Sequence, residues 1–171
     1  MSKIDGGIID YAIYENGKEY LGTARITLPD VSAKTFTVNG AGIPGDVSVP
    51  VIGSSDPMTV NIQWIDISDA AYKLLTPTVH TIDCRAAHEG LKSTGITQTG
   101  AKHILQIIPT KLTTGQLAPQ TAQSMSGDYS CISRKDYIDG KCVLDYQPLN
   151  NVYKVGATDY LATTRKLLGK K

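Results

Sequence analysis

Residues 132–146 read Ile-Ser-Arg-Lys-Asp-Tyr-Ile-Asp-Gly-Lys-Cys-Val-Leu-Asp-Tyr, with Asp139-Gly140 between two runs that are rich in strand-forming residues. Asp and Gly both tolerate positive φ, so this dipeptide predicts a type I′ turn and a two-residue hairpin loop. The loop length would set the register and place Arg134 opposite Asp145, a favourable cross-strand charge pair. The predicted opposite pairs are Ile138 with Lys141, Tyr137 with Cys142, and Arg134 with Asp145. The stretch therefore indicates a β protein, and Arg134, Asp139, Gly140 and Asp145 are the candidate defining residues of this sheet hairpin.

Both faces of the predicted hairpin mix apolar and charged side chains. One face would carry Ile132, Arg134, Asp136 and Ile138 with Lys141, Val143 and Asp145, and the other Ser133, Lys135 and Tyr137 with Cys142, Leu144 and Tyr146. Such faces fit a sheet that its own core covers on one side and a neighbouring subunit covers on the other. An edge hairpin with mixed surfaces accounts for the same pattern equally well.

Strand patterns recur along the rest of the chain. The strictest is residues 59–64, where Val60, Ile62 and Trp64 alternate with polar residues and are predicted to share one face. The other predicted strands are residues 32–38, 81–86, 103–108 closed by Pro109, and the pair 11–14 and 20–24 around Asn16-Gly17. β-Branched and aromatic residues favour strands, and Asn-Gly favours a hairpin turn. The chain is therefore predicted to be mainly β.

Two short helices are also predicted. The first is expected between Ser68, which can cap it, and Thr76-Pro77, which would end it, with Asp69 in the first turn. The second would run from residue 158 or 159 to residue 168, and Gly169 would end it. The Gly-, Pro- and Ser-rich segments predicted to be loops are 39–50, 53–57 and 113–127. The last is long for a compact domain, and such loops are usually functional or mobile.

The composition fits one domain spanning residues 1–171, with 41% apolar and 19% charged residues, where about 25% charged is usual. A low charge fraction leaves surface that a partner could cover, although a plain Thr-, Ser- and Gly-rich β protein would show the same value. The net charge of +1 gives no basic field of the kind that nucleic acid recognition needs. No apolar run reaches the roughly 18 residues of a membrane span, so we expect no membrane insertion and a protein retained in a cytoplasm. The odd, sparse set Cys84, Cys131 and Cys142 is expected to be reduced and buried.

The sequence lacks the usual catalytic and ligand-binding motifs. Residues 40–45 match G-x-G-x-x-G, but extended residues follow instead of the helix that a dinucleotide site requires. His80, His88 and His103 lack the closely spaced cysteine pair that structural zinc prefers. There is no Gly-x-Ser-x-Gly or His-Glu-x-x-His segment. We therefore expect no catalytic, cofactor-binding or metal-binding residues.

Several short segments, taken in order along the chain, form a family pattern. They are Tyr20-Leu21-Gly22-Thr23-Ala24 with Thr27-Leu28-Pro29, the Gly-rich run 40–45 with Val47-Ser48-Val49, Trp64, and a closing block. The closing block is the most specific and contains Tyr137-Ile138-Asp139-Gly140, Leu149-Asn150, Val155-Gly156, Asp159-Tyr160-Leu161-Ala162, Arg165 and Leu168-Gly169. Together these segments, which span residues 11–169, resemble the major tail tube proteins of contractile-tailed bacteriophages and R-type bacteriocins.

The resemblance implies a β-sandwich or partial barrel with one or two short helices. Six such subunits would form a ring in which their inner sheets join into one β-barrel around a channel, and the rings would stack into a tube. Closure around a ring would remove the liability of unpaired sheet edges, and head-to-tail contacts that close make rings. The stacking loop of the family would fall at residues 39–50. Its candidate inter-ring residues are Asn39, Gly40, Gly42, Pro44 and Gly45.

The implied function is that of a structural subunit in the inner tube of a contractile injection particle, a conduit that a contracting sheath drives through a cell envelope. The implied partners are further copies of the chain, the tail sheath protein, a tape-measure protein, and baseplate and terminator proteins, with DNA only as non-specific cargo. Since each neutralised phosphate adds affinity, we expect few net positive charges on the channel lining. The tube would be assembled in a host bacterial cytoplasm and act in a virion tail or an extracellular bacteriocin particle.

Other functions remain open on the sequence alone. A type VI secretion-type tube protein would share the architecture, which by itself does not separate the two. A monomeric β-sandwich binding module, for example for carbohydrate, would favour exposed aromatic side chains, and the chain has one Trp, one Phe and nine Tyr. An enzyme without a recognisable motif is a third alternative.

Overall fold

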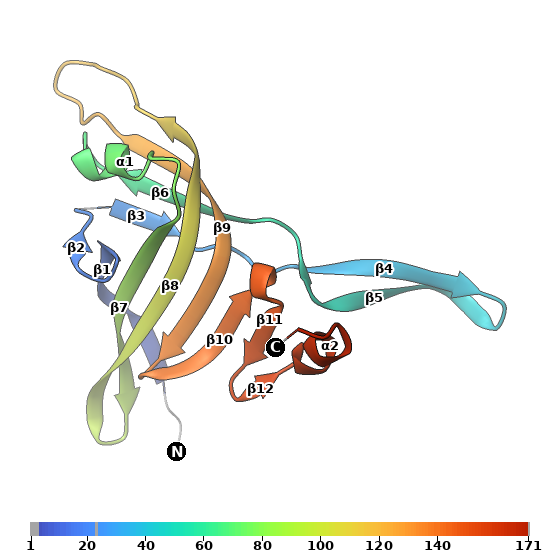
Figure 1. Ribbon diagram of the computed structural model, residues 1–171. Coiled ribbons are helices and arrows are strands. Elements are labelled where there is room, and N and C mark those ends of the chain that lie inside the picture. Colours follow the sequence, from blue (N-terminus) through green and yellow to red (C-terminus); the bar gives the residue numbers. More distant parts are fainter. Residues whose placement is uncertain (1–3, 23, 171) are drawn as a thin grey trace.

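The computed structural model describes residues 4–22 and 24–170, so Met1 to Lys3, Thr23 and Lys171 lie outside the described residues. Within those ranges it consists of a large antiparallel sheet, a two-stranded arm that projects from it, and two short α-helices (Figure 1). The prediction of a mainly β fold with one or two short helices is confirmed. No helix among the described residues is both long and apolar enough to cross a membrane.

The main sheet follows the order β12-β11-β10-β9-β8-β7-β1-β2, and β3 and β6 join it through β9. Its strands are β1 (Ile4–Glu15), β2 (Glu19–Tyr20), β3 (Ala24–Thr27), β6 (Met58–Trp64), β7 (His80–Lys92), β8 (Gly95–Thr113), β9 (Met125–Ile138), β10 (Lys141–Gln147), β11 (Val152–Val155) and β12 (Thr158–Asp159). A 3₁₀ turn, η1 (Pro148–Asn150), joins β10 to β11. From β7 to β12 each strand pairs with the next along the chain, so this part is a meander of hairpins.

Strand β9 divides the sheet into two parts. Along one edge, its first half pairs with β6, from Met125 opposite Trp64 to Cys131 opposite Met58. The second half of the same edge pairs with β10. Strands β6 and β3 therefore lie over one end of the sheet, whereas β10 to β12 extend its other end (Figure 1).

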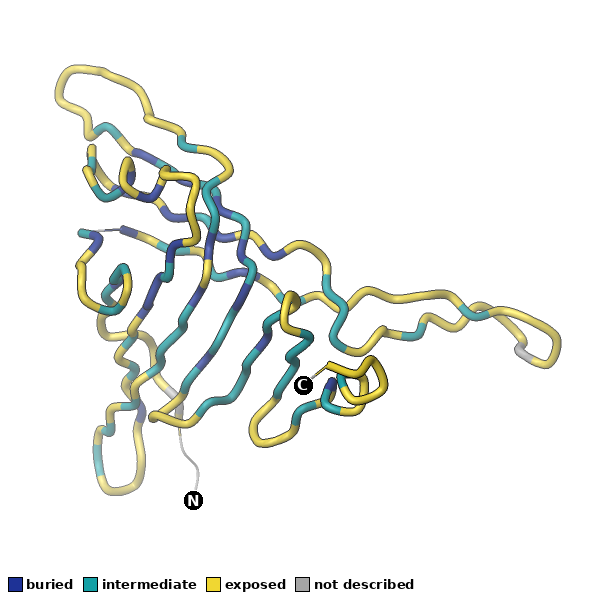
Figure 2. The backbone as a smooth tube through the Cα atoms, viewed as in Figure 1, coloured by how far each residue is buried: buried dark blue, intermediate teal, exposed yellow. Residues whose placement is uncertain are grey.

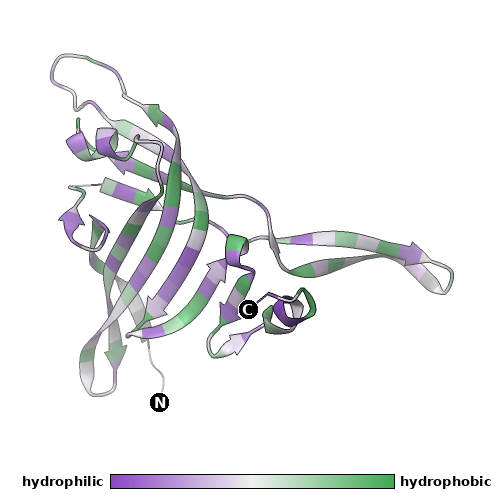
Figure 3. Cartoon of the chain, in the orientation of Figure 1, coloured by the Kyte–Doolittle hydropathy of each residue, from purple (hydrophilic) through white to green (hydrophobic). Residues whose placement is uncertain are grey.

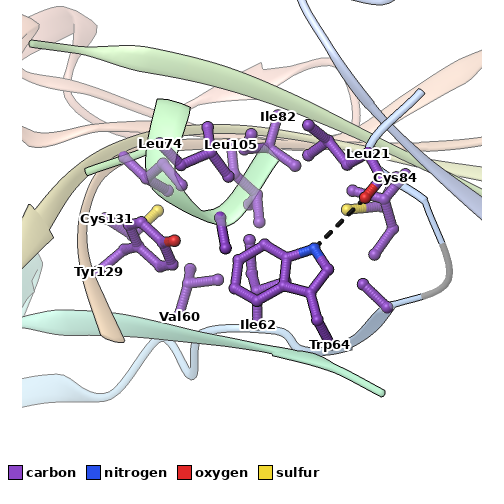
Figure 4. Close-up of a cluster of buried hydrophobic side chains, with 14 of the residues drawn as sticks. Leu21, Val60, Ile62, Trp64, Leu74, Ile82, Cys84, Leu105, Tyr129 and Cys131 are labelled. Carbon is purple, nitrogen blue, oxygen red and sulfur yellow. Dashed lines mark hydrogen bonds between the residues drawn. The ribbon is translucent and has the colours of Figure 1, made fainter. Parts of the chain in front are cut away.

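The hydrophobic core lies between β3 and β6 on one side and the overlying ends of β7, β8 and β9 on the other (Figure 4). The burial pattern of β6 confirms that Val60, Ile62 and Trp64 face the core. The indole Nε1 of Trp64 donates a hydrogen bond to the carbonyl oxygen of Leu21 at 3.3 Å, so its single polar group is satisfied on burial. Helix α1 (Asp69–Lys73) closes the core, and Leu74 at its end is fully buried.

The two helices follow the predictions in part. Ser68 is the N-cap of α1 and Asp69 lies in its first turn, although the Ser68 side chain makes no capping hydrogen bond in the described structure. Helix α2 (Ala162–Leu167) is shorter than predicted because residues 158 and 159 pair with β11 as strand β12. Gly169, with φ 66°, ends α2, and the following amide donates to the carbonyl oxygen of Arg165 at 2.9 Å.

All three cysteines are free thiols. Cys84 and Cys131 are buried, and burial raises the pKa of their thiols to about 12 and about 11. Cys142 is half-buried. The prediction of burial is therefore confirmed for Cys84 and Cys131 but not for Cys142, and the two buried thiols behave as small apolar core groups.

The turn between β9 and β10 has the predicted geometry, but the predicted register holds only next to it. Asp139 and Gly140 have φ values of 48° and 77°, as a type I′ turn requires. Ile138 faces Lys141, and Tyr137 faces Cys142. A bulge at Val143 then shifts the register, because one extra residue on β10 has no partner on β9.

The predicted pairing of Arg134 with Asp145 is therefore wrong. Beyond the bulge Asp145 faces Lys135, and Arg134 faces Tyr146. The same shift changes the face on which residues 144–146 lie, so the faces predicted for that end of the hairpin are also wrong. A loop length determines the register only as far as the first extra residue.

Two of the predicted loops and one predicted strand end also differ. Strand β8 continues past Pro109 to Thr113, because an irregularity between Pro109 and Lys111 accommodates the proline. Residues 39–50 and 53–57 lie largely in the strands of the arm rather than in loops. Residues 114–124 do form a long connection, between β8 and β9, as predicted.

Candidate assembly surfaces

The arm consists of β4 (Ala33–Gly40) and β5 (Ile43–Ser55), which among the described strands pair only with each other. It projects well away from the main sheet, and most of its residues are exposed (Figures 1 and 2). A two-stranded hairpin is at best marginally stable in water by itself. The arm is therefore suited to contact another molecule.

One face of the arm is apolar. Phe36 pairs with Val49 and Val38 pairs with Val47, whereas the intervening residues Thr35, Thr37, Ser48 and Pro50 lie on the other face. The four apolar residues, which we call the arm stripe, are Phe36, Val38, Val47 and Val49. Phe36 is 52% exposed and Val47 49% exposed, and Figure 3 shows the apolar positions along both strands. Val38 and Val49 are half-buried. The stripe therefore leaves apolar surface exposed in the described chain and is a candidate docking surface.

The tip of the arm contains all five residues predicted for inter-ring contact: Asn39, Gly40, Gly42, Pro44 and Gly45. Asn39 Nδ2 donates to Asp46 Oδ1 at 3.3 Å across the hairpin. Gly42 and Gly45 have φ values of 90° and 122°, which side chains rarely adopt. Residues 40–45, which match G-x-G-x-x-G, form the turn at the tip and the start of strand β5. The helix that a dinucleotide site requires does not follow them.

The base of the arm is fastened to the C-terminal part of the chain. The Tyr146 hydroxyl lies 2.8 Å from Ser55 Oγ and 3.1 Å from the carbonyl oxygen of Gly53. Gly53 has φ 70°, and a Cβ there would stand 2.5 Å from Leu161 Cδ1. Leu161 itself is held by the turn before α2, where Asp159 forms an ion pair with Arg165. The direction of the arm is thus determined by β10, β12 and α2.

Both borders of the main sheet are incompletely paired. At one border, β2 covers only Tyr14 and Glu15 of β1, and residues 4–12 of β1 have no described strand on that side. At the other border, β12 covers only Lys154 and Val155 of β11. Unpaired strand edges present free backbone donors and acceptors, which favour pairing with another chain.

The sheet face that points away from the core is polar. We define this polar sheet face by the residues that alternate with the core-facing ones and stand side by side in the observed registers. They are Asp10, Ala12, Tyr14, Asp83, Arg85, Ala87, Glu89, Gln98, Gly100, Lys102, Ile104, Lys135, Tyr137, Cys142, Asp145, Lys154 and Asp159. Its carboxylates are Asp10, Asp83, Glu89, Asp145 and Asp159, and its cations are Arg85, Lys102, Lys135 and Lys154, so the face as a whole carries no net positive charge.

Ion pairs join these charges across neighbouring strands. Asp83 Oδ2 lies 2.8 Å from an Arg85 guanidinium nitrogen and 3.1 Å from Lys102 Nζ. Lys135 Nζ lies 3.5 Å from Asp145 Oδ2. The last pair takes the place of the pair predicted for Arg134.

Arg134 instead lies on the core side of β9, where it donates to both carboxylate oxygens of Asp136 and to the carbonyl oxygen of Pro29. His103 Nδ1 contacts Asp136 Oδ1 at 2.8 Å. Burial raises the pKa of the Asp136 carboxyl, but the hydrogen bonds from His103 and Arg134 outweigh it, and the pKa lies below its ordinary value. This cluster stabilises the fold at the point where β9 changes partner from β6 to β10.

Asp139 has a second role besides the turn. Its carboxylate accepts a hydrogen bond from the Gly100 amide at 2.9 Å, and its own amide donates to the Gly100 carbonyl oxygen at 2.9 Å. The hairpin loop is thereby fastened to β8. Sequence reasoning identified the turn but not this contact.

The structure thus brings the five tip residues together and separates the four hairpin residues into a turn, a core-side cluster and the polar sheet face. Sequence reasoning missed Asp83 and Tyr146. The alternation of residues 81–86 places Asp83 on the face opposite Ile82 and Cys84 and gives no sign of its burial. Among the described residues, no three His, Cys, Asp or Glu side chains are grouped as metal ligands would be.

Comparisons with known proteins agree with this geometry. The family model described as "Phage tail tube protein FII" matches residues 6–169. A solved chain from the cryo-EM structure of an extracellular contractile injection system, the PVC sheath-tube complex in the extended state, has a similar fold. The TM-score is 0.57 at 11% sequence identity, over 77% of this chain and 90% of that chain. The comparison with curated proteins finds no match.

Proposed function

Because the chain belongs to the phage tail tube protein FII family and is a structural subunit of a tail tube, we propose that it forms hexameric rings that stack into a conduit for DNA or another cargo. It would do so as one domain and without catalysing a reaction. The observation that carries the proposal is the arm, a free hairpin with an apolar stripe that needs a second copy to cover it.

The two open borders of the main sheet support ring closure. In a ring, the uncovered stretch of β1 on one copy would lie beside the β11 border of the next, and pairing would satisfy their free backbone groups. Exposed apolar side chains on β1 favour this burial, since Ile4 is 61% exposed and Ile8 58% exposed. The contact is head-to-tail, so it closes only when the rotation per copy completes a circle.

The polar sheet face would line the channel. The polar sheet face is the side of the sheet opposite the core and α1. In a ring that joins the sheets edge to edge, this face points either toward the ring axis or away from it. An ion-paired surface without net positive charge suits an inward lining, because it does not hold phosphates. The core side, with α1, would then face outward.

The arm would reach the neighbouring ring. Asn39, Gly40, Gly42, Pro44 and Gly45 at its tip are the proposed inter-ring residues, as the family's stacking loop implies. The arm stripe would pack against the next ring, and burial of its exposed apolar surface would stabilise the stack.

A tail sheath protein would surround the tube, as the similar structure of a sheath-tube complex supports. The outward region around α1 is the proposed contact, since it exposes Ile65, Ile67, Tyr72, Leu75 and Val79. A tape-measure protein and baseplate and terminator proteins would be the other partners, and DNA a non-specific cargo. The particle would be a virion tail or an extracellular bacteriocin particle, assembled in a bacterial cytoplasm.

Negative-stain electron microscopy and sedimentation velocity of the purified, concentrated chain test the proposal. Rings of six copies or hollow tubes are expected. A monomer at every concentration would contradict ring formation and favour the monomeric binding module. A type VI secretion-type tube would also give rings, and sheath and baseplate genes beside the coding sequence would distinguish the phage-type particle from it.

A further inference from the structure

Asp83 is an unusual residue for the polar sheet face, because it points away from the core and is nevertheless buried. Its side chain is 5% exposed, whereas those of Arg85 and Lys102 are 48% and 40% exposed. The two cations and the turn at Gly17 cover it, and a Cβ on Gly17 would lie 3.4 Å from Asp83 Oδ2. The carboxylate is therefore buried beneath the two cations with which it pairs.

The sheet register explains why two cations share this carboxylate. Arg85 and Lys102 are directly opposite each other on β7 and β8, and like charges in that position repel. Asp83 precedes Arg85 by two residues and lies diagonally from Lys102, so its Oδ2 reaches both side chains. Without Asp83 the pair would stand as an unneutralised positive site in the middle of the face.

Further contacts hold the Arg85 guanidinium along the sheet. It lies 5.0 Å from the centre of the Tyr14 ring and donates to the Gly17 carbonyl oxygen at 3.3 Å. Hydrogen bonding and charge from Asp83 raise the pKa of Arg85, so the group stays charged and bound to the carboxylate. Its Nε and one of its terminal nitrogens thus donate to the protein itself.

We propose that Asp83 is the residue that keeps the polar sheet face from binding polyanions, because its single carboxylate pairs with both Arg85 and Lys102 and lowers their combined charge from +2 to +1. The inference rests on the proposed function in one respect: it takes the polar sheet face as the channel lining, along which a nucleic acid would pass. Asp145 does the same for one cation, Lys135, at the longer distance of 3.5 Å. Asp83 is thus a specificity residue of the conduit, one that excludes a ligand.

Salt-dependent DNA binding by the purified full-length chain tests this inference. Affinity for a short fluorescent DNA duplex would be measured by anisotropy between 50 and 200 mM salt. Asp83→Asn raises the charge of this site from +1 to +2 and leaves both cations unpaired, so the slope of log affinity against log salt should steepen by about 1 to 2. Over that salt range the steeper slope is roughly a 3- to 12-fold larger loss of affinity. Asp145→Asn should steepen it by about 1.

Asp30→Asn is the matched control, because it removes the same charge from an exposed position outside this face. Its slope should equal that of the wild type. Asp83→Glu, which keeps the carboxylate, should also bind like the wild type. Equal slopes for Asp83→Asn and Asp30→Asn, with both folded by circular dichroism, would overturn the inference. If Asp83→Asn does not fold, Asp145→Asn against Asp30→Asn decides it in the same way.

Assembly of the same variants separates this inference from the proposed function. Tubes formed in the presence of the duplex and then treated with nuclease should retain more protected DNA for Asp83→Asn than for the wild type or Asp30→Asn. DNA that binds but is fully digested would place the polar sheet face outside the tube and overturn the lining. Failure of the wild type to form rings would overturn the proposed function, whereas the slopes of the subunits would still decide the role of Asp83.

Discussion

The Tyr146 hydroxyl lies 2.8 Å from Ser55 Oγ and joins a strand of the main sheet to the base of the arm. The two residues are 91 positions apart in the chain. Tyr146 is 2% exposed, and its partners Gly53 and Ser55 are half-buried. This contact makes the direction of the arm depend on the C-terminal part of the fold.

Tyr146→Phe should therefore destabilise the protein by about 1–3 kcal/mol, because the Gly53 carbonyl and the Ser55 hydroxyl lose a buried partner. Urea unfolding followed by tryptophan fluorescence measures the change. Limited proteolysis should also cut the arm faster in the variant. Tyr153→Phe is the control, since the Tyr153 ring packs edge-on against Tyr146 without this hydrogen bond. Equal losses in both variants would contradict the assigned role.

Gly53→Ala should cost about 2 kcal/mol or more. The position has φ 70°, and the new Cβ would stand 2.5 Å from Leu161 Cδ1. Thermal unfolding gives the measurement. Gly40→Ala is the matched control in the same arm, because the described structure leaves open space around its Cβ and its φ is not positive. A fully stable Gly53→Ala protein would show that the arm base is not held against Leu161.

The low pKa of Asp136 predicts a loss of stability in acid. A carboxyl whose folded pKa lies below its unfolded value of about 3.9 stabilises the fold above that value, and this contribution is lost as pH falls through the folded pKa. Asp136→Asn should remove about 1–3 kcal/mol at pH 7 and flatten the decline of stability below about pH 5. Unfolding free energies in urea from pH 7 to pH 3 test this. Parallel pH profiles for wild type and variant would contradict it.

Asp139→Ala should destabilise the β9–β10 hairpin by about 1–2 kcal/mol. Alanine is disfavoured at φ 48°, and the hydrogen bond from the Gly100 amide is lost. Asp139→Asn should be close to wild type, because asparagine tolerates this conformation and keeps an acceptor oxygen. Amide hydrogen exchange at Gly100 reports directly on the contact. Slow exchange in Asp139→Ala would count against it.

Val47→Asp should abolish tube formation while changing monomer stability by less than about 0.5 kcal/mol. Val47 is 49% exposed in the arm stripe, so a charge there costs little until a second copy covers it. Ser48→Asp, which puts the same charge on the opposite face of β5, is the control and should assemble. Negative-stain images and urea unfolding give the two readings. Tubes from Val47→Asp would exclude the stripe as a stacking surface.

Much of the fold was predictable because local patterns determine it. Strict alternation in residues 59–64 predicted the core face of β6. Asp139-Gly140 predicted the turn between β9 and β10, because both residues tolerate positive φ. The glycines of residues 40–45 correctly marked a turn, yet the flanking residues were taken for loop because exposed strands of an arm carry no core-facing pattern. Local sequence patterns thus predict a strand where the chain itself buries one of the strand's faces.

The sequence by itself determined a mainly β chain, the position of its turns and the residues of its core strand, since these follow from alternation and backbone preference. Only the tertiary structure decided that Lys135 rather than Arg134 meets Asp145, that Asp83 is buried beneath two cations, and that Tyr146 holds the base of the arm. The physical reason is that a single extra residue at Val143 reverses the faces that follow it. Contacts between residues far apart in the chain depend on such registers, which no local pattern contains.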